Sequence, residues 1–127
     1  MVKILILEDN AKAIQAITNG IQELRTELGE IETIIISRGE EAIDFASRGE
    51  VEKFDVILLD YISADNINFH QAVLDKVDSQ KVITISNTID YNRMAEEKGV
   101  SRSVQKDYFN LMNFKNKLKD EIKSILI

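Results

Sequence analysis

The feature that most constrains the fold is a set of short, unbroken apolar runs with helical patterns between them. In Ile4–Leu7 and Val56–Leu59, four apolar residues follow one another without polar alternation. Such runs are typical of strands that are buried on both faces, as in parallel sheets. Between these runs, Ile14, Ile17 and Ile21 recur at helical spacing. The alternation of buried strand and helix predicts an α/β fold.

The unit repeats along the whole chain. Strands are predicted at 2–7, 31–36, 54–59, 81–86 and 101–105, and helices at 10–28, 37–47, 69–77, 89–98 and from 107 onward. Ser37 and Glu40 fit a capping box at the start of the second helix, and Gly29, Gly49 and Gly99 follow helices as C-terminal stops. Right-handed crossovers then give a parallel sheet with helices on both faces. With five strands the expected order is 2-1-3-4-5, that of a flavodoxin-like, doubly wound sheet.

Length and composition exclude several classes of protein. The 127 residues are enough for one domain. The chain has no cysteine, which excludes disulfides and thiolate metal sites. Its net charge of −6 argues against nonspecific binding to nucleic acid or to an anionic membrane surface. No signal peptide or membrane-spanning run is present, so we expect a cytoplasmic protein.

Polar residues stand at the carboxyl ends of the predicted strands, where sites of such sheets lie. They are Glu8, Asp9, Asp60, Ser86 and Lys106. Three neighbouring carboxylates repel unless cations balance them; the lysine supplies one positive charge, and Mg²⁺, which prefers carboxylate and phosphate oxygens, can supply the rest. A carboxylate beside a metal can attack phosphorus to give an acyl phosphate. Asp60 is therefore the candidate nucleophile.

The stretches KILILEDN, FDVILLD, VITIS and GVSRSVQK resemble the receiver domains of two-component response regulators, and the resemblance covers the whole chain. It implies the following roles: Asp60 as phosphoacceptor; Asp9 as a direct ligand of Mg²⁺ (or Mn²⁺), with Glu8 acting through water; the backbone carbonyl of Ile62 as a further ligand; Ser86 and Lys106 as contacts of the phosphoryl group.

The resemblance also implies partners. Residues 1–127 are expected to form a single receiver domain with no output domain. The donor would be a phosphohistidine on a sensor histidine kinase or a histidine phosphotransfer protein, and output would be docking to a downstream protein or phosphorelay. Transfer to Asp60 and slow autodephosphorylation would be self-catalysed, with Ile62, Asn87 and Thr88 modulating the attack of water.

The chain departs from the family pattern at several positions. The loop YISADNINF lacks the usual proline and glycine. Asn87 is bulkier than the usual small residue, and Ser103 stands where an aromatic switch residue is usual. Asp107 replaces the proline that usually follows the lysine, which leaves the Lys106–Asp107 peptide open between cis and trans, with trans favoured.

Two other classes of protein fit the sequence less well. A phosphatase of the haloacid dehalogenase type needs a second aspartate where Ile62 stands, and a nucleotide-binding module needs glycines that EDNAKA lacks. Taken singly, each acidic or polar site residue is also explained as a cap, a turn former or a surface charge. His70 is expected to be an ordinary structural residue. The alternative that stays open is a degenerate receiver-like binding module that acts without phosphorylation.

Overall fold

A single five-stranded parallel sheet organises the chain. The computed structural model describes the backbone of residues 1–60, 65–86 and 89–127. The strands are β1 (Val2–Leu7), β2 (Ile31–Ile36), β3 (Val56–Leu59), β4 (Val82–Ser86) and β5 (Arg102–Gln105). Their order is β2-β1-β3-β4-β5, and every pair is parallel. The predicted flavodoxin-like, doubly wound sheet is confirmed.

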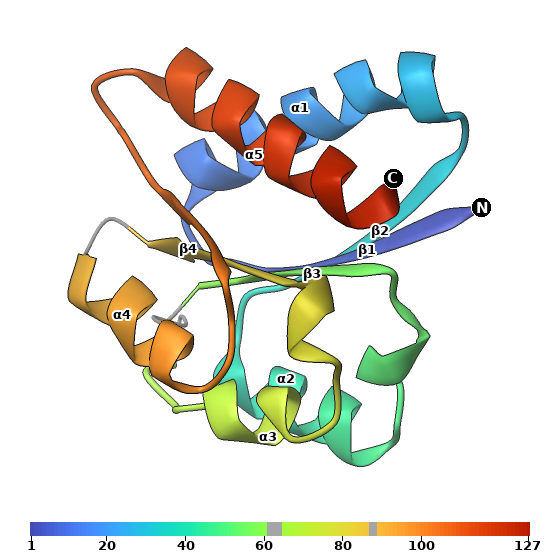
Figure 1. The fold of residues 1–127 in the computed structure, drawn as a ribbon. Helices are drawn as coiled ribbons and strands as arrows, with labels where there is room; N and C mark the ends of the chain where they lie inside the picture. The colour runs from blue at the N-terminus through green and yellow to red at the C-terminus, as the bar shows by residue number, and fades with distance from the viewer. Residues whose placement is uncertain (61–64, 87–88) are drawn as a thin grey trace.

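Helices cover both faces of the sheet. Figure 1 shows α1 and α5 on one face and α2, α3 and α4 on the other. Their bounds are α1 Ala11–Leu28, α2 Gly39–Ser47, α3 His70–Leu74, α4 Ile89–Glu97 and α5 Leu111–Leu126, with short 3₁₀ helices at Val51–Lys53 and Ser79–Lys81. Alternate residues of the central strands point to opposite faces, so β1 gives Ile4 and Ile6 to the core under α1 and α5, and Leu5 and Leu7 to the other core. No described helix is both long enough and apolar enough to cross a membrane.

The predicted capping box of α2 is wrong. The helix begins at Gly39, two residues beyond Ser37, and its N-cap residue Arg38 makes no side-chain capping bond. The carboxylate of Asp65 takes this role from the loop after β3, because it accepts hydrogen bonds from the backbone N–H groups of Gly39 (2.8 Å) and Glu40 (3.1 Å). The start of α2 is thus fixed by a residue far away in the sequence.

The last helix begins at Leu111 rather than at Asp107. The Asp107 carboxylate accepts from the backbone N–H groups of Phe109 and Asn110, which closes a turn instead of starting a helix. Asn110 then caps α5 by accepting from the N–H of Asn113 at 3.0 Å. The third helix is also shorter than predicted, since it ends at Leu74 instead of Val77.

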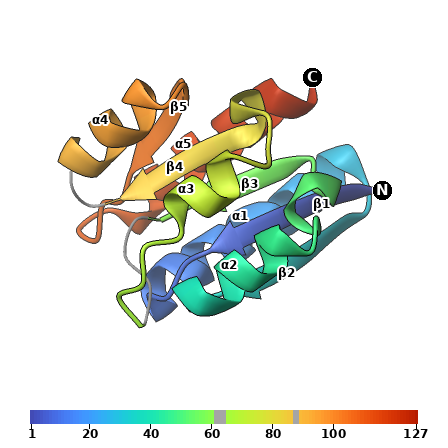
Figure 2. The same ribbon diagram turned by 90° about the horizontal axis from the view of Figure 1, so that it is seen from below.

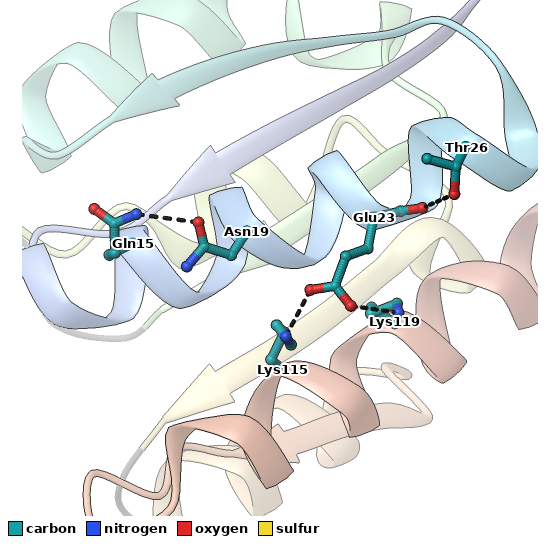
Figure 3. A network of polar contacts seen from close by, with 6 residues as sticks. All are labelled: Gln15, Asn19, Glu23, Thr26, Lys115 and Lys119. Carbon is teal, nitrogen blue, oxygen red and sulfur yellow. Dashed lines mark hydrogen bonds and ion pairs between the residues drawn. The ribbon is translucent and has the colours of Figure 1, made fainter.

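Charged side chains join α1 to α5 along their shared edge. The Glu23 carboxylate accepts from the ammonium groups of Lys115 and Lys119, as Figure 3 shows. Glu27 pairs with Lys123 at 2.7 Å in the same seam. Beneath the seam, α5 buries Phe114, one of the largest fully buried side chains of the described structure. Apolar packing and a solvent-facing ion-pair network together hold the two helices on one face.

Candidate functional site

Adjacent strand ends bring the predicted site residues together. The backbone N–H of Asp60 donates to the carbonyl of Leu7 at 3.0 Å, so the end of β3 lies against the end of β1. The N–H of Lys106 donates to the carbonyl of Ser86 at 2.8 Å, which places the lysine beside the end of β4. The site therefore lies at the carboxyl edge of the sheet, where the strand order predicts it.

A buried lysine joins two buried carboxylates at this edge. Lys106 Nζ lies 2.6 Å from Glu8 Oε1 and 3.2 Å from Asp60 Oδ2. The exposed fractions are 1% for Glu8, 4% for Asp60 and 8% for Lys106. Such groups are almost never this buried unless they are paired. The contact connects residues that lie 98 positions apart in the chain, so it depends on the whole fold.

The surroundings of Glu8 in this cluster disfavour its ionised form. Burial, followed by the charge of Asp60, raises the pKa of Glu8 to about 8, although Lys106 opposes both effects. Burial lowers the pKa of Lys106, but the carboxylates of Glu8 and Asp60 outweigh it and the net pKa is raised. One ammonium thus lies beside two carboxyl groups, and near neutral pH Glu8 keeps its proton unless a further positive charge is bound.

The acidic residues fit a divalent cation. Ligand atoms of Glu8, Asp9 and Asp60 all lie within 4.8 Å of one another, and Asp9 is exposed while the other two are buried. Glu8 Oε2 is buried and has no hydrogen-bond partner in the described structure, so it offers a carboxylate oxygen that needs a positive neighbour. Hard oxygen ligands of this kind suit Mg²⁺, Mn²⁺ or Ca²⁺.

The remaining predicted site residues fall into two groups. Ser86 is 1% exposed at the end of β4, whereas Ser103 lies exposed on β5. Ile62, Asn87 and Thr88 lie outside the described residues, and their roles stay predictions.

The peptide bond after Lys106 has the form that is favoured in the absence of proline. The Lys106–Asp107 peptide bond is trans, since the described residues contain no cis peptide bond.

Sequence reasoning missed Tyr108. Its pKa is raised by burial, an effect that Lys106 opposes through its charge and a hydrogen bond to the tyrosine. Tyr108 is 37% exposed, and the adjacent Phe109 is fully exposed. The signal was present in the sequence as two aromatic residues directly after Lys106-Asp107, but the prediction considered aromatic residues only on the strand before the lysine.

The comparisons with known proteins identify the fold. No protein-family model and no curated protein matches the chain. Among solved structures, the chain is similar to the phosphorylated cyanobacterial phytochrome response regulator RcpA (20% identity, TM-score 0.76, covering 98% of this chain and 94% of RcpA). It is also similar to the Mn²⁺-bound response regulator Rcp1 (17%, TM-score 0.74, 94% and 91%) and to a response regulator from Hahella chejuensis (19%, TM-score 0.76, 99% and 96%). The chain therefore has the fold of response regulator receiver domains.

Proposed function

We propose that the protein is a phosphoaccepting receiver of two-component signalling, with Asp60 as the phosphoacceptor. The observation that carries this proposal is the contact of Asp60 with Lys106 (3.2 Å) beside the acidic pair Glu8 and Asp9, at the carboxyl edge of a sheet with the receiver fold. A structural carboxylate at a strand end does not need both a buried ammonium and two further acids around it. A phosphoryl acceptor does, because charge on the transferring group must be neutralised.

Each residue has a chemical task in this proposal. Asp60 Oδ forms the new bond to phosphorus while the N–P bond of a donor phosphohistidine breaks, and the released imidazole nitrogen takes a proton from solvent. Lys106 Nζ, already 3.2 Å from Asp60 Oδ2, pairs with the phosphoryl oxygens, and Ser86 offers a hydroxyl. Asp9, Asp60 and the carbonyl of Ile62 would hold Mg²⁺, which supplies positive charge to the phosphoryl oxygens when bound.

The similar proteins support the type of chemistry. RcpA is described as phosphorylated and Rcp1 as Mn²⁺-bound, and both align along nearly the whole chain. By extension, the donor is a sensor histidine kinase or a histidine phosphotransfer protein, and the output is docking to a downstream protein or phosphorelay. We place the protein in the cytoplasm, where such partners present their phosphohistidines.

The signalling route differs from the usual one of the family. Ser103 is exposed and its hydroxymethyl group has little apolar area to bury, so it cannot act as a packing switch. Segments 61–68 and 87–90 contain no proline and are rich in polar residues, and we expect a new charge at Asp60 to act on them. Comparison of amide chemical shifts with and without beryllofluoride should show the largest changes in these two segments. Large changes confined to 100–110 and α5 would contradict this route.

The lifetime of the phosphoryl group is expected to be long. Ile62 is apolar and cannot orient a water molecule, and Asn87 adds bulk beside the phosphoacceptor. Autodephosphorylation should therefore take many minutes, and a lifetime of seconds would refute the roles given to Ile62 and Asn87.

The deciding experiment is incubation with acetyl phosphate and Mg²⁺, followed by intact mass measurement. The wild type should gain the mass of one phosphoryl group. Asp60→Asn should not gain it, whereas the matched control Asp120→Asn, a change at an exposed aspartate of α5, should label like the wild type. A wild type that stays unlabelled with saturating donor would support a receiver-like binding module that acts without phosphorylation.

A further inference from the structure

The outer edge of β2 is an open edge of the sheet. Strand β2 is the first strand of the order and pairs with β1 alone among the described strands; Figure 2 shows it at the border of the sheet. The carbonyls of Glu30 and Ile36 accept from residues of the β1 side, Val2 and Glu8. In a parallel ladder the N–H and C=O of one residue point to the same side, and the side alternates along the strand. The backbone groups of the odd residues 31, 33, 35 and 37 therefore point outward.

One of these outward groups is already covered. The guanidinium of Arg25 donates to the carbonyl of Ile31 from Nε (3.2 Å) and from Nη2 (2.9 Å). Within residues 1–60, 65–86 and 89–127, no other hydrogen bond covers this edge, so the open stretch runs from Thr33 to Ser37. Arg38 continues it with extended backbone, φ −111° and ψ 134°.

The open stretch lacks the devices that usually protect a sheet edge. Segment 31–37 contains no lysine and no proline, and Ile35 is 45% exposed although it is apolar. Natural edge strands are normally blunted by lysine, proline, bulges or a covering element, because an uncovered apolar edge pairs with another strand. This edge is therefore suited to receive a strand.

We propose that the occupant is β2 of a second copy of this chain, paired antiparallel about a two-fold axis at Ile35. In this register Ile35 lies opposite Ile35 of the second copy, and Thr33 lies opposite Ser37. Both pairs are of the hydrogen-bonded type, because all these residues point their backbone groups outward. The pairing uses the open stretch alone and leaves the contact of Arg25 with Ile31 intact.

Charge complementarity favours the second copy and this register. Glu32 lies opposite Arg38 of the second copy, and the two-fold axis repeats this pair. Within one chain these residues are six positions apart along an extended segment, about 20 Å, so they cannot pair with each other. The side chain of Arg38 is 52% exposed, and its contact with Glu40 is long, at 3.7 Å. A register centred on Ile34 would instead place Ser37 against the carbonyl of Ile31 that Arg25 already binds.

The proposed dimer leaves both candidate sites accessible. Because the strands run antiparallel across the join, the carboxyl edges of the two sheets face opposite directions, and the Asp60 of each copy stays open to its own partner. A join through one strand on each side is smaller than a standard protein interface. The association should therefore be reversible and depend on protein concentration.

Sedimentation equilibrium of the full chain, over concentrations from about one micromolar to about one millimolar, tests the proposal. The wild type should shift from monomer toward dimer. Ile35→Lys, which places two like charges opposite each other, should remain monomeric. Glu32→Arg and Arg38→Glu should each weaken the dimer at least several-fold, and the double variant E32R/R38E should regain wild-type association. Thermal melts confirm that each variant is folded.

The charge variants separate pairing from a general charge effect. Glu32→Arg reduces the net negative charge, which by itself favours association, yet the proposal expects weaker dimers. The matched control Glu97→Arg makes the same change on α4, away from β2, and should not weaken the dimer. A wild type that stays monomeric throughout, a dimer that is insensitive to Ile35→Lys, or a double variant that fails to recover would overturn the proposal.

Cysteine cross-linking checks the register independently. The chain has no cysteine, so Ile35→Cys would place a single thiol on the axis, where opposed Cα atoms about 5.5 Å apart permit a disulfide. With oxidised glutathione, Ile35→Cys should form a covalent dimer faster than Ile34→Cys and than Ser103→Cys, which lies exposed on the opposite edge strand β5. Faster cross-linking of Ile34→Cys would exclude the axis at Ile35, and equal rates at 103 and 35 would exclude the β2 interface.

Discussion

Replacement of Glu8 by glutamine should change how stability depends on pH. The pKa of this carboxyl is raised in the folded protein from an ordinary 4.5 to about 8. Because the folded state holds the proton more tightly than the unfolded state, Glu8 contributes stability below pH 4.5, and this contribution is lost as the pH rises through 8. A difference of about 3.5 in pKa, at about 1.4 kcal/mol for each, corresponds to a loss of about 5 kcal/mol. Glutamine keeps the shape and an oxygen for Lys106 but has no proton to lose.

The assay is urea denaturation with EDTA present, for wild type and Glu8→Gln between pH 5 and pH 8.5. At pH 5 the protonated Glu8 resembles glutamine, so the two free energies of unfolding should agree within about 1 kcal/mol. At pH 8.5 the variant should be more stable by several kcal/mol. The matched control Glu52→Gln, at an exposed site, should follow the wild type at every pH. Parallel profiles for Glu8→Gln and wild type would refute the account of the buried cluster.

Other changes test the metal, the caps and the core. Mg²⁺ at millimolar concentration should raise the melting temperature more at pH 8 than at pH 6, because the cation competes with the proton on the acidic cluster; Asp9→Asn should abolish the shift, and a shift that survives would contradict the site. Asp65→Ala should lower the free energy of unfolding by about 1 kcal/mol through loss of the α2 cap, with unchanged urea midpoints arguing against the cap. Lys115 and Lys119 hold the pKa of Glu23 below its usual range, so its contribution is present above the ordinary pKa and is lost as the pH falls; Glu23→Gln should flatten the acid limb of the stability profile, and an identical limb would refute it. Phe114→Ala should cost about 3 to 5 kcal/mol in the same denaturation assay, and a cost below about 1 kcal/mol would show that α5 does not seal the core.

The fold could be predicted because its determinants are local. Unbroken apolar strands and helical stripes are read directly from neighbouring residues. The predicted stops after α1, α2 and α4 are also local: Gly29, Gly49 and Gly99 all have positive φ, from 73° to 95°, a conformation in which a residue without Cβ is favoured. The right-handed crossover rule gave a parallel sheet with helices on both faces, and the order 2-1-3-4-5 was expected because it is a common arrangement for five such units.

Caps were predicted less well, because the same residue types serve turns and helix starts alike. Ser37 fits the capping pattern but lies too early, and the acid that performs the capping, Asp65, comes from a loop 26 residues away from Gly39. Asp107 fits a helix start but closes a turn. The first difference is tertiary, since a distant acid supplies the cap, whereas the second is a local choice between a turn and a helix start.

For the candidate site, the positions of the residues could be predicted but their protonation states could not. The sequence predicted that Glu8, Asp60 and Lys106 lie at the carboxyl edge of the sheet, because each follows a recognisable strand and the order of the strands could be expected. It did not show that one ammonium would lie between two carboxylates that are almost fully buried, or that Glu8 would hold its proton to about pH 8. Those properties depend on desolvation by the finished core, and desolvation disfavours a charge far more than distance alone suggests. A bound cation or a proton can each compensate the buried negative charge of Glu8, so the two compete. The pH dependence of Mg²⁺ binding therefore measures most directly how strongly burial disfavours the ionised form of Glu8.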